Sequence, residues 1–126
     1  MRVLCCYCGG VSVEKLSGSV QDYLKAVWVL GEWSNEPVTT SKIAARVGVR
    51  PATASETIKK LAKQALVEHS PYGAITLSEE GRCLALAMVR RHRLIETFLV
   101  EKLGYGWEEV HAEAEVLEHA VSDLMV

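Results

Sequence analysis

Apolar residues recur at helical spacing in five parts of the chain, and short turn sequences separate those parts. The first part, residues 19–33, has apolar side chains every three or four positions: Val20, Leu24, Val27 and Leu30. This period predicts an amphipathic helix. Ser19 and Asp22 fit a Ser-x-x-Asp capping pattern, so we expect the helix to begin at about Ser19 and to end before the turn sequence SNEP.

Two shorter helices are predicted around a tight turn. The second helix starts after Thr39 or Thr40 and ends at Gly48, a residue suited to the left-handed conformation that stops a helix. The third runs from Pro51, which lacks the N–H that the first turn leaves unused, to about Gln64. Their expected buried positions are Ile43, Ala44, Val47, Ala54, Ile58 and Leu61. This arrangement is a helix-turn-helix pattern.

The rest of the pattern extends this to a winged helix. In LVEHSPYGAITL, two β-prone runs flank residues 70–73, whose Pro and Gly positions suit a turn, so we expect a hairpin. Ser78 is placed to cap a long helix over 79–103, which GYG ends, and a fifth helix is expected from Trp107 to the end of the chain. The predicted fold is mainly α: a winged helix-turn-helix followed by a helical domain.

Composition sets the expected domain limits and compartment. The 126 residues, almost half of them hydrophobic, suffice for a small core but include no membrane-spanning run. We expect a disordered leader at 1–17, a DNA-binding domain at 18–77 and a helical domain at 78–126 that is truncated. No segment resembles a secretory signal, so we expect a cytoplasmic protein. Its four cysteines should then be thiols, and none of them has the spacing of a zinc site. They are Cys5, Cys6, Cys8 and Cys83.

The charge is distributed unevenly, although the net charge is only −2. Residues 38–69 carry six Lys or Arg against two Glu, a net charge of +4, whereas residues 92–126 carry two basic residues against eight acidic ones, a net charge of −6. A basic segment suits a polyanion such as double-stranded DNA, and an acidic segment suits cations.

The acidic segment contains a group of metal-capable side chains. At 100° per residue, four of them lie within an arc of about 100° on one helix face: His111, Glu115, Glu118 and His119. On the preceding helix, His92 and Glu96 share a face four residues apart. The alternative is a solvated face with weak ion pairs. The zincin motif, the nucleophile elbow and the phosphate loop are all absent, so we expect a protein that is not an enzyme and takes no small-molecule substrate.

Two segments behind the winged helix resemble a known family. The sequences MVRRHRLIETFLVEKLG and VHAEAEVLEHAVSD, at their mutual spacing, are similar to those of the diphtheria toxin repressor (DtxR) family of metal-dependent repressors. The resemblance covers residues 19–126. It implies a homodimer whose divalent metal joins the first helix to the fifth.

The resemblance also implies two sets of metal ligands. Carried over by position, the primary site would use Asp22, Glu115, Glu118 and His119, and the ancillary site would use His92, Glu96 and His111. The iron-sensing branch has Met in place of Asp22 and Cys in place of Glu115. Because carboxylates suit Mn²⁺ better than soft donors do, the chain looks like the manganese-sensing (MntR) branch. It departs from the compact sensors of that branch at Lys25, where they carry Glu, which argues against a closely spaced two-metal cluster.

These expectations define a hypothesis: a Mn²⁺-activated transcriptional repressor of metal-homeostasis genes that binds a palindromic operator. Its expected DNA-binding residues are Arg50, Pro51, Ala52, Thr53, Ser55, Glu56, Lys59 and Lys60. Two alternatives remain open, an Fe²⁺-dependent repressor of the same family and a winged-helix dimer that ignores metal. A hydrolytic metalloenzyme is disfavoured, because four protein ligands leave little room for substrate.

Overall fold

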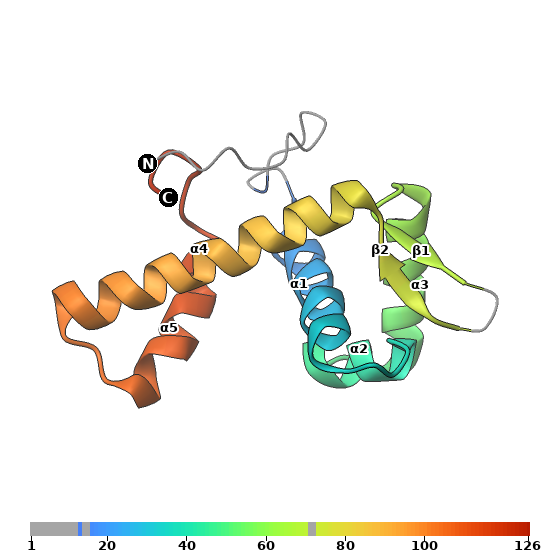
Figure 1. Cartoon of the computed structure of the whole chain (residues 1–126), viewed down its shortest axis with the longest axis horizontal. Coiled ribbons are helices and arrows are strands. Elements are labelled where there is room, and N and C mark those ends of the chain that lie inside the picture. Colours follow the sequence, from blue (N-terminus) through green and yellow to red (C-terminus); the bar gives the residue numbers. More distant parts are fainter. Residues whose placement is uncertain (1–12, 14–15, 71–72) are drawn as a thin grey trace.

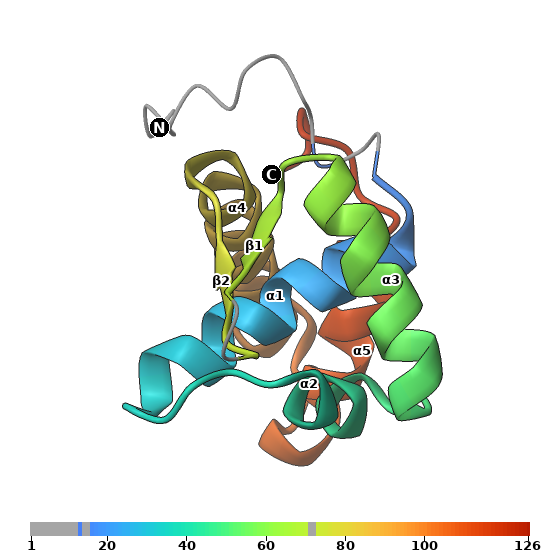
Figure 2. The same ribbon diagram turned by 90° about the vertical axis from the view of Figure 1, so that its right-hand side faces the viewer.

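The structure, a computed structural model, describes residues 13, 16–70 and 73–126. Three helices and a hairpin gather at one end, and the long helix α4 (Glu79–Leu103) runs from them to α5 (Trp107–Glu118), which packs against its far half (Figure 1). Seen from the end that carries the winged helix, α2, α3 and the hairpin face the viewer, and α4 recedes behind them (Figure 2). The predicted mainly α architecture is confirmed.

The first helix, α1 (Gly18–Trp33), begins earlier than predicted. Ser17, not Ser19, is the N-cap: its backbone is extended and its hydroxyl accepts a 3.2 Å hydrogen bond from the N–H of Val20. Val13 is buried in the core, so contacts of the folded part begin before the boundary expected at residue 18. Leu16 also packs against the core, and residues 1–12, including Cys5, Cys6 and Cys8, and 14–15 of the predicted leader lie outside the described residues.

The helix-turn-helix prediction is confirmed. α2 (Thr40–Val47) is capped by the Thr39 hydroxyl, and Gly48 ends it in the left-handed conformation at φ +80°. α3 (Pro51–Lys63) starts at the predicted proline. Five of the six expected core positions are buried and Val47 is half-buried, because the stripes of both helices face α1 and the hairpin.

The predicted hairpin is also present. β1 (Val67–His69) pairs antiparallel with β2 (Ile75–Leu77), with Val67 opposite Leu77. Pro71 and Tyr72 of the expected turn lie outside the described residues.

α4 and α5 follow the prediction at their starts but not at the chain end. Ser78 caps α4 as expected, and its hydroxyl accepts from the N–H of Gly81. α5 stops at Glu118 instead of continuing to the end. The buried guanidinium of Arg91 explains this stop, because it donates to the carbonyls of Glu118 and Val121 and pairs with Asp123. Among the described helices, none combines the length and apolar character that a membrane crossing needs.

Gly81 sets how closely the hairpin approaches α4. A Cβ atom built at Gly81 would lie 1.9 Å from the carbonyl oxygen of Leu66, a distance no side chain can adopt. The same oxygen accepts from both the N–H and the hydroxyl of Ser78. The start of α4 is therefore held against the residue that precedes β1.

We predict that Gly81→Ala lowers the free energy of unfolding by about 2–3 kcal/mol, because the backbone must move to admit the methyl group. Gly31→Ala is the matched control: it lies in α1, where the added Cβ meets only Val38 at an ordinary 3.9 Å. That control should stabilise the protein by about 0.5–1 kcal/mol through helix propensity. Urea unfolding measures both, and equal effects would contradict the close approach.

Candidate metal centre

The chain folds so that α1 and the end of α5 bring three of the four predicted primary ligands together. Oxygen or nitrogen ligand atoms of Asp22, Glu118 and His119 all lie within 4.8 Å of one another. The Nε2 atom of His119 is 3.0 Å from Asp22 Oδ1 and 3.8 Å from Glu118 Oε1. Asp22 lies on the first turns of α1, so this group connects the winged-helix half of the fold to α5.

Glu115, the fourth predicted ligand, is not part of this group. Its side chain is about half exposed, and its Oε1 is 3.3 Å from Nε2 of His111, one helical turn away. It does line the same open pocket as Asp22 and Lys25. The helical arithmetic places Glu115 on the correct face, but local pairing with His111 decides where its carboxylate lies.

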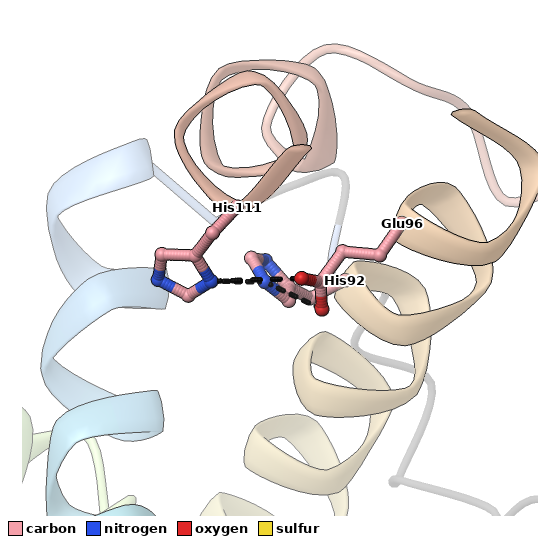
Figure 3. A group of neighbouring side chains, drawn as sticks. All are labelled: His92, Glu96 and His111. Atoms are coloured by element: carbon pink, nitrogen blue, oxygen red, sulfur yellow. Dashed lines mark hydrogen bonds and ion pairs between the residues drawn. The ribbon is translucent and has the colours of Figure 1, made fainter. Parts of the chain in front are cut away.

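The three predicted ancillary ligands form a second group (Figure 3). His92 and Glu96 come from α4, four residues apart, and His111 comes from α5. Nε2 of His92 is 3.0 Å from Glu96 Oε1 and 3.0 Å from Nδ1 of His111. His92 is buried and His111 is exposed, so this group has one face open to solvent.

Glu118 joins the two groups. Its side chain is completely buried, and its Oε2 is 2.5 Å from Nδ1 of His92, on the ring edge opposite the second group. A carboxylate only accepts hydrogen bonds, so Nδ1 of His92 donates to Glu118 when it carries the proton, and in a neutral ring of that form the lone pair lies on Nε2, next to Glu96 and His111. Glu118 is thus a candidate ligand in one group and the residue that orients a ligand in the other.

Lys25 supplies a positive charge at the same place. Its ammonium donates to both oxygens of Glu118, at 3.0 and 3.2 Å, and its Nζ is 3.3 Å from Nδ1 of His92. In the sequence, Lys25 was only a departure from a family pattern. The structure places this charge between the two groups, as the counter-charge of the buried carboxylate.

The two carboxyl groups of the first group differ in their electrostatics. Burial raises the pKa of Asp22 above its ordinary value, and Glu118 adds to the rise, although His119 and Lys25 oppose it. Burial also acts to raise the pKa of Glu118, but the hydrogen bond from His92 and the ammonium of Lys25 outweigh it and hold this pKa below its ordinary value. An added cation would therefore stabilise the charged form of Asp22 more than that of Glu118, which already has Lys25 and His92 as partners.

Sequence reasoning missed two buried polar residues around the centre. Arg91 holds the end of α5, and Gln21, next to Asp22, contacts His119. Both carried a readable signal, because each lies on the apolar face of its helix: Arg91 is three residues from Met88, and Gln21 is three residues from Leu24. A polar residue on such a face needs a partner, and the sequence alone does not say which.

The predicted DNA-binding residues lie together on α3 and its N-cap, Arg50. Seven of the eight are exposed, and Ser55 is half-buried. Lys59 and Lys60 have side chains on the exposed surface of the helix. The structure therefore leaves a continuous polar and basic helix surface available for a ligand.

Known proteins share this two-part organisation. Residues 15–75 match the iron dependent repressor N-terminal DNA binding domain, and residues 78–126 match the iron dependent repressor metal binding and dimerisation domain. The chain belongs to the iron-dependent repressor family, the family of the diphtheria toxin repressor.

Individual relatives extend this likeness to whole domains. A helix-turn-helix transcriptional regulator of Methanocaldococcus jannaschii, itself uncharacterized, is 35% identical over 108 residues, 86% of each chain. The iron-dependent repressor IdeR of Mycobacterium tuberculosis is 35% identical over 111 residues, 88% of this chain and 48% of that protein. The structure of a manganese-dependent transcriptional repressor in complex with manganese is 62% identical with a TM-score of 0.79, over 84% of this chain and 48% of that chain. The chain spans about half the length of the last two.

We predict that Lys25→Met lowers the free energy of unfolding of the metal-free protein by about 3 kcal/mol, because Glu118 stays buried without its ammonium partner. Lys42→Met is the matched control, since Lys42 pairs with Glu36 at a similar 2.9 Å but on the surface. Exposed pairs contribute little, so that variant should unfold like the unmodified protein. Urea titrations in the presence of a chelator make the comparison. Equal losses in the two variants would show that the buried pair has no special importance.

Proposed function

We propose that the protein is a metal-dependent transcriptional repressor that binds double-stranded DNA as a homodimer, with Mn²⁺ as its activating ion. The observation that carries this proposal is the group formed by Asp22, Glu118 and His119, because it spans the DNA-reading unit and α5. A cation held there would connect the two parts of the fold. Family membership supports the same reading.

The donor chemistry fits a divalent ion and favours manganese. The first group offers two carboxylates and one imidazole, and the second offers two imidazoles and one carboxylate. Neither contains a thiol or a thioether, and such hard donor sets suit Mn²⁺. The manganese-dependent relative supports this choice, whereas the name of IdeR keeps Fe²⁺ as the alternative.

The DNA contacts would come from α3. Its exposed N-terminal residues would enter a major groove, where Pro51 and Ala52 would touch thymine methyl groups and Glu56 would accept from a cytosine amine. Thr53, Ser55, Lys59 and Lys60 would bind phosphates, with Arg50 beside them at the start of the helix. A two-fold dimer then implies a palindromic operator.

The helical half offers an apolar surface for the dimer. On the described residues, large hydrophobic side chains are exposed at the far end of α4, on α5 and in the C-terminal turn: Leu94, Phe98, Leu103, Trp107, Val116, Leu124 and Met125. Leu94 and Phe98 lie on the second half of α4. Their exposure of 41% and 49% supports a role at a subunit contact.

Regulation would act on how the winged helix and the helical half lie relative to each other. With an ion bound, Asp22 on α1 and His119 at the end of α5 would be held at a fixed separation. This would restrict the angle between α3 and the dimer surface, so that two α3 helices match major grooves about 34 Å apart. If the ion binds the DNA-competent conformation about 100-fold more tightly than the other conformations, it stabilises that conformation by about 2.7 kcal/mol. This is enough to operate a switch.

The first test is fluorescence anisotropy of labelled DNA from upstream of the protein's own gene. Mn²⁺ is titrated from a chelated start, with anaerobic Fe²⁺ and Mg²⁺ in parallel. We expect tight binding with Mn²⁺ alone. An equal response to Fe²⁺ would replace manganese by the iron alternative, and binding that ignores metal would contradict the proposed switch.

We predict that Asp22→Asn has opposite effects with and without metal. The raised pKa of Asp22 means that its stabilising contribution exists below its ordinary pKa and is lost as the pH rises through the raised value. At pH 7, removing the charge should therefore raise the Tm of the metal-free protein and abolish the further rise produced by Mn²⁺. Glu32→Gln, an exposed carboxyl on the same helix, is the control and should leave both values unchanged. Thermal unfolding with and without Mn²⁺ measures the effect, and an intact Mn²⁺ shift in the Asp22 variant would remove it from the ligand set.

We predict that Lys59→Ala and Lys60→Ala each weaken binding to all DNA sequences about equally. Each should also make the negative slope of log affinity against log salt shallower by about 1. Lys102→Ala, in the last turn of α4, is the control and should change neither quantity. Anisotropy over a salt series provides both numbers. A slope that does not change in the α3 variants would show that these lysines do not contact phosphates.

A further inference from the structure

Gln21 is a buried polar side chain beside the first metal-ligand group. Only 2% of its surface is exposed, and all of its hydrogen-bonding atoms have partners. Its amide nitrogen donates to the carbonyl of Val13 at 2.8 Å and to that of Leu16 at 3.2 Å. Its amide oxygen lies 2.5 Å from Nδ1 of His119. One side chain thus connects the residues before α1 with a candidate ligand at the end of α5.

These partners allow only one orientation of the Gln21 amide. A backbone carbonyl can only accept a hydrogen bond, so the NH₂ group must face Val13 and Leu16. The amide oxygen must then face His119, because the two ends of the amide point in different directions. Reversing the amide would place its oxygen against two carbonyl oxygens in a buried site, which is strongly unfavourable.

The fixed amide determines the protonation pattern of His119. An amide oxygen only accepts, so Nδ1 of His119 must carry a proton to complete the hydrogen bond. In a neutral ring the lone pair then lies on Nε2, the atom that is 3.0 Å from Asp22. The nitrogen next to the carboxylates is therefore the one that can bind a cation.

The surroundings hold the same ring in position from two further sides. The ring rests on the first turn of α1, where a Cβ on Gly18 would lie 3.7 Å from its Cγ. The backbone of the preceding residue is held by Arg91, which donates to the carbonyl of Glu118 and ends α5 there. Rotation of the ring is the freedom that remains, and the hydrogen bond to Gln21 opposes it.

We propose that Gln21 is a positioning residue that fixes the tautomer and orientation of His119, so that Nε2 and not Nδ1 is presented to the metal ion. This inference rests on the proposed function, because it assigns Gln21 a role at that same centre. Gln21 does not itself bind the ion. Its effect comes through His119, and outer partners of this kind change metal affinity by about 10- to 100-fold.

Two substitutions separate this role from simple packing. Gln21→Met has nearly the same volume but neither accepts from His119 nor donates to the two carbonyls. Gln21→Glu keeps an acceptor for Nδ1 but loses the donor and places a carboxylate against the carbonyls of Val13 and Leu16. Gln64→Met, at the exposed end of α3, is the matched control.

Mn²⁺ affinity is measured from the electron paramagnetic resonance signal of free Mn²⁺, and stability from urea unfolding without metal. We expect Gln21→Met to lose about 10- to 100-fold in affinity and Gln21→Glu to stay within a few-fold of the unmodified protein. Both variants should be less stable without metal, and Gln64→Met should match the unmodified affinity. If both Gln21 variants lost affinity equally, in proportion to the stability that each had lost, Gln21 would be only a packing residue. That result would overturn the proposal.

Nitrogen NMR of ¹⁵N-histidine protein loaded with diamagnetic Zn²⁺ tests the tautomer directly. We expect a proton on Nδ1 of His119 and the metal on Nε2, with this proton exchanging faster with water in Gln21→Met than in Gln21→Glu. The reverse assignment in the unmodified protein overturns the proposal even if Gln21→Met does not fold. If the unmodified protein binds no Mn²⁺, the proposed function itself fails. Normal binding that Gln21→Met leaves unchanged would refute the Gln21 role alone.

Discussion

The buried carboxylate of Glu118 is the interaction on which the rest of this structure depends. A charge completely removed from water requires compensation, and here it comes from two other helices, through Lys25 of α1 and His92 of α4. These three residues join α1, α4 and α5 at one point. The placement of the end of α5 against α1 is therefore an electrostatic requirement, whereas the apolar packing of α5 is with α4.

The same contact makes the two candidate metal groups dependent on each other. Glu118 belongs to the first group, and its Oε2 also forms a hydrogen bond with Nδ1 of His92, whose other nitrogen belongs to the second group. A change in the charge around Glu118 must therefore affect how basic and how well oriented His92 is. The ammonium of Lys25 lies between the groups, and its positive charge opposes a second cation close to the first. The electrostatic arrangement thus supports two separate sites and not a compact two-metal cluster.

The two apolar clusters explain how such a charged junction is tolerated. The larger core holds α1, α2, α3, the hairpin and the first half of α4, while a small one of Ile95, Leu99, Val110 and Ala114 holds α5 against the second half. Among the described residues, the small cluster has four buried residues against sixteen in the larger core, so it contributes the smaller share of the apolar burial. Most of the apolar burial therefore lies away from α5, and the end of α5 meets α1 through polar contacts to Lys25 and Gln21.

The sequence by itself determined the elements, because their signals are local: the caps at Thr39 and Ser78, the stop at Gly48, the proline of α3 and the helical period of the apolar residues. Spacing along a helix also places His92 with Glu96 and shows which face of α5 is acidic, whereas the full ligand sets, with Asp22, came from the family resemblance. Only the tertiary structure decided which of these side chains meet. Glu115 pairs with His111, α5 ends where Arg91 binds its carbonyls, and Gln21 and Lys25 become parts of the centre. These outcomes depend on contacts between residues up to 98 positions apart, and helical periodicity carries no information about such distances.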